Sequence, residues 1–381
     1  MGTSLLNVLF SWHAAVLAAN QKYIGYLAEE PDLRVTLLVP PRWDESTAMV
    51  EAYVPAAAPY EVRVDPVKKA CKGISFRYCN IRETLRQVQP DVVFLYEEPY
   101  SYVAWQVLYR QRQICPQAKF IFYTWQNLDC PYSFWHRLAE KYVFRHSTIG
   151  VAGSRDCEDV LRLHGFAKPV RRIPLAIDPA DFPSVSGQPM RTELGLRQFV
   201  IGYIGRLACE KGLEDLLAAL AKLSDLPWQL LLIGSGPDEL SLRQLAGRLG
   251  IGDRIVWVPY VKNTEMYRYY PAMDLFVLPS RTTTAWKEQF GRVLIEAMSC
   301  GTPVIGSSSG EIPLVIDQAG LIFPERDSHC LASAIRQLME DEPRRQHLAE
   351  LGRERVLTHF TWKKVAQLTA DIIREAARGV N

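Results

Sequence analysis

Four charged residues in the second half of the chain have types and spacing that suit chemistry on one ligand. Glu288 and Glu296 belong to "KEQFGRVLIEAMSCGTPVIGSSSGEIP" (287–313), and Glu296 lies in an apolar run, where a charge is costly to bury without a partner. Arg206 and Lys211 belong to "GYIGRLACEKGLEDLLAAL", after an apolar run. Carboxylates accept hydrogen bonds from neighbouring hydroxyls, whereas two cations beside a helix N-terminus favour a diphosphate. The pattern predicts a site for a phosphorylated, hydroxyl-rich ligand.

Each of these residues also has a purely structural explanation. Glu288 could stabilise a helix N-terminus, Glu296 could form an internal salt bridge, and Arg206 and Lys211 could be surface charges of a solvated turn. A second glycine-rich turn, "IGSGPDEL" (233–240), follows another expected strand and is expected at the same edge of the sheet. Neither turn has the spacing of a GxGxxG or a P-loop motif.

The elements that must position these residues are short apolar runs that alternate with helical patterns. Such alternation predicts βαβ units and parallel sheets, hence an α/β, doubly wound fold. Helices are expected at 102–114 and 155–165, among others. The runs expected as buried strands are 5–10, 34–40, 91–98, 119–125, 147–154, 199–206, 228–236, 254–261, 274–280, 302–308 and 320–324.

The chain is long enough for two domains, and its pattern indicates where they meet. A stretch rich in Pro, Asp, Ser and Gly interrupts the alternation, so we expect a linker at 179–198. It would separate two Rossmann-like domains, 1–178 and 199–360, that face each other across a cleft. Helical spacing of apolar residues predicts a helix within 361–381 that could pack on either domain. Because ligands of doubly wound sheets bind at the carboxyl ends of strands, the substrate is expected between the domains.

The formal net charge of the chain is only +2, so the total implies no strong polyanion partner, and we expect no nucleic acid partner. The segment 61–86 is nevertheless basic. We interpret it either as a solvated face or as a surface for an anionic membrane or a phosphorylated acceptor.

Cysteine usage and the N-terminus predict a cytoplasmic protein. The eight cysteines show no metal-binding spacing and are expected to be buried thiols in a reducing compartment, with no metal site. The first residues lack the basic region of a signal peptide, and no run reaches the ~18 apolar residues of a membrane span. Peripheral attachment to the inner membrane face stays open.

Taken together, the motifs resemble a known family. "EQFGRVLIEAM" followed by "CGTPVIGS" is similar to the E-x7-E signature of the retaining glycosyltransferases of family 4, which have the GT-B fold. "GYIGRLACEKG" resembles the diphosphate-binding segment of that family. "LAIDPADF", "GSGPDEL" and "MDLFVLPS" also occur in family order and spacing. The resemblance covers roughly residues 145–380 strongly and the first half mainly through its strand pattern.

The resemblance implies an enzyme that moves a hexose from a UDP or GDP sugar to a hydroxyl acceptor, in glycan or glycolipid biosynthesis. The acceptor would be a sugar, a lipid-linked group or a small molecule. No cofactor or metal is expected, and no DxD motif occurs. The implied donor contacts are Glu288 with the hexose hydroxyls, Glu296 with the ribose, Arg206 and Lys211 with the diphosphate, Phe290 and Gly291 along the sugar, and Tyr260 near the base. Of these, Glu288, Arg206 and Lys211 would act in catalysis.

The first half departs from the family. Many members have glycines after the first strand, where this chain has "FSWHAAVLAAN", and many have a histidine where this chain has Gln126 and Asn127. His13 is the nearest remaining acid–base candidate; otherwise it is a polar turn residue. Glu97 and Glu98 follow another strand and could hold an acceptor, or form an exposed acidic turn.

Other functions remain to be weighed. A sugar-nucleotide epimerase on the same fold would lack the E-x7-E pair in this setting. A non-catalytic sugar-nucleotide-binding protein would keep the same residues and differ only in turnover. A nicotinamide dehydrogenase would need a GxGxxG turn, which the chain does not have.

Overall fold

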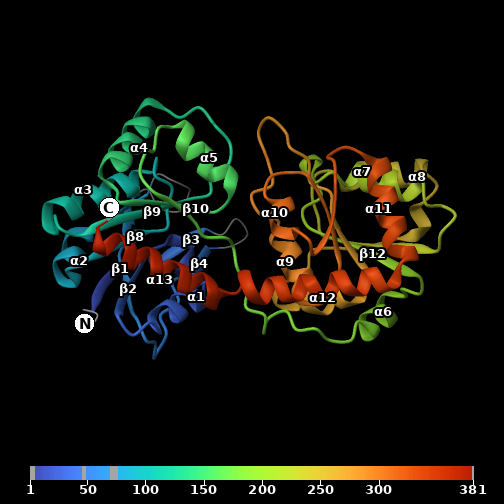
Figure 1. Cartoon of the computed structure of the whole chain (residues 1–381), viewed down its shortest axis with the longest axis horizontal. Helices are drawn as coiled ribbons and strands as arrows, with labels where there is room; N and C mark the ends of the chain where they lie inside the picture. The colour runs from blue at the N-terminus through green and yellow to red at the C-terminus, as the bar shows by residue number, and fades with distance from the viewer. Residues whose placement is uncertain (1–4, 45–48, 69–75, 380–381) are drawn as a thin grey trace. The chain divides into compact units, whose positions relative to one another are not determined.

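The computed structural model describes residues 5–44, 49–68 and 76–379, and the chain forms two compact units (Figure 1). Unit 1 comprises Met1–Pro174 and Trp362–Asn381, and unit 2 comprises Leu175–Thr361. The expected linker, 179–198, therefore lies inside unit 2, and it contains helix α6 (Gln188–Leu194). Met190 is the buried residue of this helix, so no apolar period marks it in the sequence.

Unit 1 is built on a seven-stranded parallel sheet of order β11-β10-β9-β8-β1-β2-β5. Strands covered on both faces consist of continuous apolar residues, which is why β1 and β8 to β10 stand out in the sequence. The strands are β1 (Leu6–Ser11), β2 (Leu33–Val39), β5 (Glu61–Val64), β8 (Val92–Leu95), β9 (Lys119–Thr124), β10 (Ile149–Ala152) and β11 (Val170–Arg172). The helices are α1 (Ala18–Ala28), α2 (Ile81–Val88), α3 (Tyr102–Ile114), α4 (Phe134–His146), α5 (Arg155–Leu163) and α13 (Trp362–Arg378), with a 3-10 turn η1 (His13–Val16).

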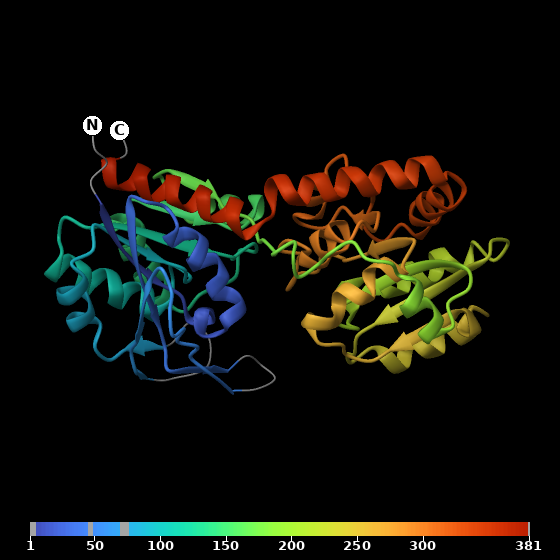
Figure 2. The ribbon, with the colours of Figure 1, turned by 90° about the horizontal axis from the view of Figure 1, so that it is seen from below.

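The helices of unit 1 form layers on both faces of this sheet. From β1 the chain passes through α1 to β2 in one direction, whereas α3 and α4 connect β8, β9 and β10 in the opposite direction. Right-handed crossovers then place α1 on one face and the α3–α4 pair on the other. The C-terminal helix α13 packs against α1, β8 and β9 (Figure 2).

The segment between β2 and α2 contains two short antiparallel pairs that the sequence did not predict. They are β3 (Arg42–Asp44) with β4 (Met49–Glu51), and β6 (Val67–Lys68) with β7 (Arg77–Tyr78). The basic stretch 61–86 runs through β5, β6, β7 and the start of α2. Its Lys69 and Lys72 lie outside the described residues, whereas Arg77, Arg82 and Arg86 are exposed.

Unit 2 is built on a six-stranded parallel sheet of order β14-β13-β12-β15-β16-β17. Its strands are β12 (Phe199–Ile204), β13 (Trp228–Ile233), β14 (Ile255–Val258), β15 (Leu275–Leu278), β16 (Val304–Ser307) and β17 (Gly320–Phe323). After α6, its helices are α7 (Leu213–Ala221), α8 (Glu239–Arg248), α9 (Arg292–Ser299), α10 (Ile312–Ile316), α11 (Ser328–Glu340) and α12 (Glu342–His359). The 3-10 turns are η3 (Cys209–Lys211), η4 (Gly252–Arg254), η5 (Asn263–Arg268) and η6 (Tyr270–Ala272).

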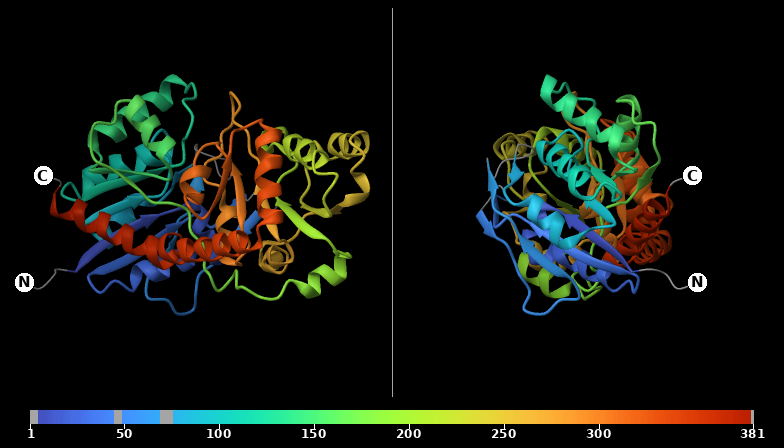
Figure 3. Two further views of the ribbon diagram at one scale, coloured as in Figure 1. Left: turned by 45° about the vertical axis from the view of Figure 1, so that its right-hand side comes forward. Right: turned by 90° about the vertical axis from the view of Figure 1, so that its left-hand side faces the viewer.

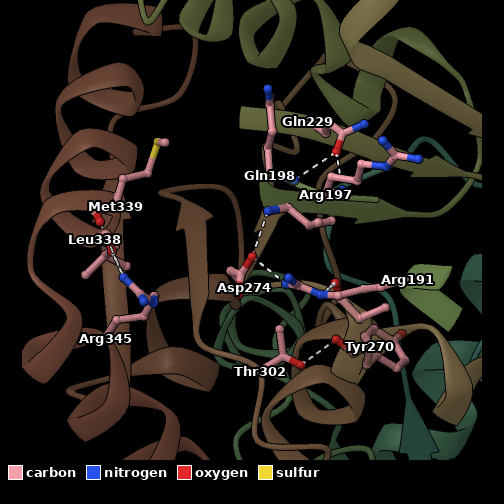
Figure 4. Close-up of polar contacts among 12 residues, drawn as sticks. Arg191, Arg197, Gln198, Gln229, Tyr270, Asp274, Thr302, Leu338, Met339 and Arg345 are labelled. Atoms are coloured by element: carbon pink, nitrogen blue, oxygen red, sulfur yellow. Dashed lines mark hydrogen bonds and ion pairs between the residues drawn. The ribbon is translucent and has the colours of Figure 1, made fainter. Parts of the chain in front are cut away.

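Polar contacts tie the segments around the start of β15 to the sheet (Figure 4). Asp274 accepts hydrogen bonds from the Arg191 guanidinium at 2.5 Å and from the Val200 amide at 2.8 Å. The Thr302 hydroxyl donates to the carbonyl of Tyr270 at 2.7 Å. These bonds fix α6 and η6, and η6 carries a tyrosine that reaches the site described below.

The structure confirms the predicted fold class in both units, since every apolar run expected as a strand overlaps one. The edge strands β5 and β11 were not predicted. Both are short and partly exposed, and β11 ends in two arginines, so they lack the continuous apolar signature of central strands.

The prediction of buried cysteines was wrong in part. Cys71 lies outside the described residues, and the other seven are free thiols. Among these seven, Cys115, Cys157 and Cys300 are buried, whereas Cys79, Cys209 and Cys330 are exposed. The exposed three lie in a strand-to-helix turn, in η3 and in the first turn of α11, where the surrounding pattern is polar.

Candidate functional site

Unit 2 contains a cavity of about 560 Å³ beyond the carboxyl ends of three adjacent strands, β12, β13 and β14. Ligands of doubly wound sheets bind at this edge. One side of the cavity is formed by α9 and another by η5. The lining residues are Ile204, Gly205, Arg206, Ile233, Gly234, Ser235, Gly236, Tyr260, Val261, Asn263, Met266, Arg292, Val293 and Glu296.

The two glycine-rich turns of this cavity touch each other through their backbones. A Cβ atom at Gly234 would lie 2.0 Å from the Gly205 carbonyl oxygen, and one at Gly236 would lie 2.2 Å from the Leu207 carbonyl oxygen. The Leu207 amide donates to the Ser235 carbonyl at 3.0 Å. The second turn needs glycine at both positions for this close approach, and the structure confirms that the two turns share one edge of the sheet.

Glu296 reaches the cavity from the second turn of α9 and is held by two neighbours. The Tyr270 hydroxyl donates to its Oε2 at 2.7 Å, and the Arg292 Nε lies 2.8 Å from its Oε1. Burial raises the pKa of the Glu296 carboxyl, while Arg292 and the Tyr270 bond oppose that shift. Glu296 therefore forms an internal salt bridge and lines the cavity at the same time, so the two sequence interpretations do not exclude each other.

Lys211 and Glu288 come from different loops and form an ion pair next to this region. The Lys211 Nζ lies 2.8 Å from Glu288 Oε2, and the Ser280 hydroxyl donates to the same oxygen at 2.9 Å. The ammonium also lies 4.3 Å from the ring centroid of Trp286, a cation–π distance. Glu288 is thus a buried carboxylate with a cation and a hydroxyl fixed on it.

Arg206 lines the cavity with a largely exposed side chain that pairs with Glu210. The Tyr203 hydroxyl donates to the Arg206 carbonyl at 2.9 Å, which fixes the turn after β12. Burial raises the pKa of Tyr203, the Glu288 and Glu210 carboxylates raise it further, and Arg206 opposes them. The cavity turn and the Lys211–Glu288 pair therefore lie within electrostatic range of one tyrosine.

The remaining donor-side residues have different surroundings. Tyr260 lines the cavity and is 68% exposed, whereas Phe290 is buried, with its ring against Phe360. Gly291 is the N-cap of α9 with φ of 83°, a conformation that favours glycine. A Cβ there would lie 3.0 Å from Leu278 and Leu294, so its surroundings are the core of unit 2.

His13 and Glu97 meet at the carboxyl edge of the sheet in unit 1. β1 and β8 are neighbours in that sheet, and each residue follows its strand within two positions. Glu97 Oε1 accepts from the His13 amide at 2.9 Å and lies 2.6 Å from His13 Nδ1. The ring centroids of His13 and Trp43 are 4.4 Å apart. A carboxylate that orients an imidazole is the arrangement of an acid–base group.

Glu98, Gln126 and Asn127 belong to the same edge of unit 1. Glu98 accepts from the Thr124 hydroxyl at 2.6 Å and from the Trp125 amide at 2.8 Å. Burial raises the pKa of Glu98 to about 7, and these two bonds oppose the shift. Gln126 accepts from the Tyr100 hydroxyl at 3.1 Å, and Asn127 is buried. The interpretation of Glu97 and Glu98 as an exposed acidic turn was therefore wrong.

Within residues 5–44, 49–68 and 76–379, no cluster of His, Cys, Asp and Glu side chains is arranged to hold a metal ion. In that same part of the chain, no helix combines the length and apolar character needed to cross a bilayer. The cytoplasmic location stays a prediction.

Sequence reasoning missed the residues that hold the two carboxylates. Ser280 follows β15 in "LPS", so the carboxyl-edge rule could have found it. Arg292 precedes Glu296 by four positions on one helix, so helical spacing could have found it, whereas Tyr270 and Trp286 carry no such signal. Tyr270 precedes its partner by 26 positions, and only the packing of η6 against α9 brings them together.

Part of the chain is similar to known proteins. Residues 189–355 match the family described as glycosyl transferases, group 1. The chain is 32% identical over 196 residues to the GDP-mannose-dependent alpha-(1-6)-phosphatidylinositol monomannoside mannosyltransferase of Mycobacterium tuberculosis, across 49% of this chain and 51% of that protein. It is 31% identical over 207 residues to the glycogen synthase of the same organism, across 53% and 48%. The chain spans about half the length of these curated relatives.

Solved structures resemble nearly the whole chain. Sucrose-phosphate synthase from Thermosynechococcus elongatus has a TM-score of 0.69 and 22% identity, and covers 97% of this chain and 98% of its own. HepE from Anabaena, in complex with UDP and glucose, has a TM-score of 0.69 and 19% identity, with 97% and 99% covered. These likenesses confirm the GT-B fold class. The match of residues 189–355 shows that the second unit is similar to the glycosyl transferases of group 1.

Proposed function

We propose that this protein is a retaining, metal-independent glycosyltransferase that moves a hexose from a UDP or GDP sugar to a hydroxyl acceptor. The acceptor is a sugar, a lipid-linked group or a small molecule, in glycan or glycolipid biosynthesis. The observation that carries the proposal is the cavity of unit 2, which combines Arg206, Tyr260 and Glu296 beside the Lys211–Glu288 pair.

The proposed donor contacts follow from the chemistry of each group. Glu296 accepts from the ribose hydroxyls, Tyr260 stacks near the base, and the hexose hydroxyls reach Glu288. Arg206 and Lys211 neutralise the diphosphate. An ammonium has three N–H donors, so Lys211 can bond Glu288 and a phosphate oxygen together.

The transfer step breaks the bond between the anomeric carbon and the diphosphate oxygen. The bonding electrons leave with the nucleoside diphosphate, the acceptor oxygen forms the new bond to carbon, and its proton is lost to the departing phosphate or to solvent. Negative charge grows on the leaving group, where Arg206 and Lys211 stabilise it electrostatically. We assign no protein nucleophile.

The relatives do not decide whether the base of the donor is uracil or guanine. HepE was solved with UDP, whereas the mannosyltransferase relative is named as GDP-mannose-dependent. A thermal-shift panel of UDP-, GDP-, ADP- and dTDP-sugars decides, because a ligand at about 100 times its Kd adds roughly 2.7 kcal/mol to the free energy of unfolding. Absence of a shift with every donor would contradict the proposal.

Turnover tests the site itself. Lys211→Met and Glu288→Gln should each lower kcat about 10²- to 10³-fold, the range seen when one stabilising group of a transition state is removed. Glu239→Gln, on the surface of α8, is the matched control and should leave kcat unchanged. Full activity in both site variants would refute the assignment. Donor binding without any turnover, across a broad acceptor screen, would favour a non-catalytic binding protein.

Metal independence is tested with the same assay. The two cations are proposed to replace a divalent ion at the diphosphate, so EDTA should leave the rate unchanged. Loss of activity in EDTA, with recovery on addition of Mg²⁺ or Mn²⁺, would contradict this part of the proposal.

A further inference from the structure

Helices α3 and α4 of unit 1 expose a group of large apolar side chains. Phe134, Trp135 and Leu138 on α4 are 67%, 65% and 44% exposed, and Trp105 and Tyr109 on α3 are each 37% exposed. The Trp105 and Tyr109 rings stack with centroids 5.4 Å apart. Single exposed apolar residues need no explanation, but a group of them on two packed helices marks a site of interaction.

Cations surround these apolar side chains. Arg137, Lys141 and Arg145 recur every four residues along α4 and are exposed. Among the described residues, none of the three forms an ion pair within 4 Å. On α3, Arg112 is exposed and lies close enough to Tyr142 of α4 to lower its pKa, against the larger effect of burial. Lys168 adds a further cation beside them, because its Nζ donates to the Arg145 carbonyl at 2.7 Å.

Acidic side chains do not balance this charge. In the sequence of the two helices, the one acidic residue is Glu140. Its carboxylate is buried and lies 3.0 Å from His164 Nδ1, and Arg137 is close enough to lower its pKa against the larger effect of burial. One buried carboxylate does not balance these exposed cations. The exposed sides of α3 and α4, which we call the α3–α4 surface, are therefore aromatic and basic together. The right-hand view of Figure 3 looks toward this side of unit 1.

We propose that the α3–α4 surface docks on an anionic lipid bilayer. Tryptophan and phenylalanine settle at the boundary between headgroups and acyl chains, while lysine and arginine reach anionic headgroups. A second copy of the chain is a poorer occupant, since a symmetric contact would press these cations against one another. Nucleic acid would leave Leu138 and Phe134 without a role.

The proposal does not depend on the transfer reaction, and it moves the membrane contact away from the basic stretch predicted from the sequence. That stretch, 61–86, has cations but among its described residues only Val64 as an exposed large apolar side chain. A lipid-docked unit 1 would suit a lipid-linked acceptor in particular.

Vesicle sedimentation of the full chain tests the proposal. The vesicles are phosphatidylcholine alone or phosphatidylcholine with phosphatidylglycerol. The wild-type protein should sediment with the anionic vesicles only, and less so at high salt. The double variant Arg137→Gln, Lys141→Gln should weaken binding about 25-fold, since each cation near an anionic surface contributes about fivefold. Phe134→Ser with Trp135→Ser should weaken binding while leaving its salt dependence in place.

Two matched controls locate the contact. Arg82→Gln with Arg86→Gln removes two exposed cations from the basic stretch, and Leu240→Ala removes an apolar side chain of 69% exposure from α8. Both should bind vesicles as the wild type does. All substituted positions are exposed, so unchanged thermal unfolding confirms that each variant is folded.

Several outcomes would overturn the proposal. They are failure of the wild type to bind anionic vesicles, undiminished binding by the α3–α4 variants, or loss of binding in the Arg82 and Arg86 control. A dimer in solution that the Phe134 and Trp135 variant abolishes would assign the surface to a second copy. Binding of an oligonucleotide, but not of vesicles, through Arg137 and Lys141 would assign it to nucleic acid.

Discussion

At the scale of single residues, both carboxylates of the site are buried and each is satisfied by groups of unit 2. Glu296 has Tyr270 and Arg292, and Glu288 has Lys211 and Ser280. A buried charge without partners would instead be neutralised. The partners hold each carboxylate in place before a ligand arrives, so less ordering remains to be done on binding.

Tyr270→Phe tests this support of Glu296. Tyr270 is fully buried, and its hydroxyl is one of two donors to a carboxyl whose pKa burial already raises. Without that donor, the carboxylate form is less favoured, and we expect about tenfold weaker nucleotide-sugar binding, with a loss of about 1–3 kcal/mol in stability. Isothermal titration and thermal unfolding measure both. Tyr269→Phe, one position earlier, should bind as the wild type does; equal weakening in the two variants would contradict the role of Tyr270.

The stability of unit 1 should depend on pH through Glu98, and it should fall as the pH rises. Burial raises the pKa of Glu98 to about 7 in the folded protein, above the ordinary value of 4.5. Between these two values the folded state binds more protons than the unfolded state does. The contribution of Glu98 to stability is therefore fully present below about pH 4.5 and is lost as pH rises to about 7. Across this window the free energy of unfolding should fall by about 1–3 kcal/mol from this group.

The comparison of wild type with Glu98→Gln isolates that effect. Thermal unfolding followed from about pH 5 to about pH 8 should lose stability more steeply in the wild type than in the variant. Parallel curves for the two proteins would show that the carboxyl stays ionised throughout.

At the scale of elements, the site depends on loops that follow parallel strands and press against one another. Gly310, between β16 and α10, has φ of 54°, and a Cβ there would lie 1.9 Å from the Glu288 carbonyl oxygen. The Glu311 amide donates to that same oxygen at 3.3 Å. The loop after β16 thus sets the position of the loop that carries Glu288.

Gly310→Ala should displace Glu288 and lower both activity and stability. The new Cβ would meet backbone atoms, and the left-handed φ disfavours any residue with a Cβ, so neither effect can relax at low cost. We expect the free energy of unfolding to fall by about 1–3 kcal/mol. Gly247→Ala is the control. Gly247 lies inside α8, and the new Cβ would meet no atom of another element within 4 Å. The substitution should raise the free energy of unfolding by up to about 1 kcal/mol. Full kcat in Gly310→Ala would show that the loop contact does not position Glu288.

At the scale of the whole molecule, unit 1 is assembled from both ends of the chain. α13 packs on α1, where the Tyr23 and Thr369 hydroxyls lie 2.6 Å apart. The Arg374 guanidinium bonds Asp32 at 2.6 and 2.9 Å and Glu30 at 2.6 Å. These bonds lower the pKa of Asp32. The last helix therefore stabilises the first.

Arg374→Met should destabilise unit 1 and spare unit 2. The variant leaves two carboxylates near α1 without their cation, and we expect the free energy of unfolding to fall by about 1–3 kcal/mol. Arg336→Met is the control, since its pairs with Asp225 and Glu340 are more exposed and contribute about 0–1 kcal/mol. Hydrogen exchange should quicken in α1 and α13 but not in α9. Faster exchange in both units would contradict a role confined to unit 1.

Much of the fold could be predicted because its signals are local. Continuous apolar runs mark the central strands, and Gly301, with φ of 79°, marks the end of α9. Segments without such signals were missed. They include α6, with Met190 as its buried residue, the edge strand β5 and the antiparallel pairs β3–β4 and β6–β7.

The sequence by itself determined the α/β class and which charged residues face one sheet edge, because strand polarity and a parallel sheet send the residues after each strand to the same side. Arg206 reaches the cavity of unit 2 for that reason, and Glu296 reaches it from α9, the helix that follows β15. Only the tertiary structure decided what holds them. Tyr270 meets Glu296, and Lys211 meets Trp286 and Glu288, through contacts between elements far apart in the chain, which no local pattern encodes.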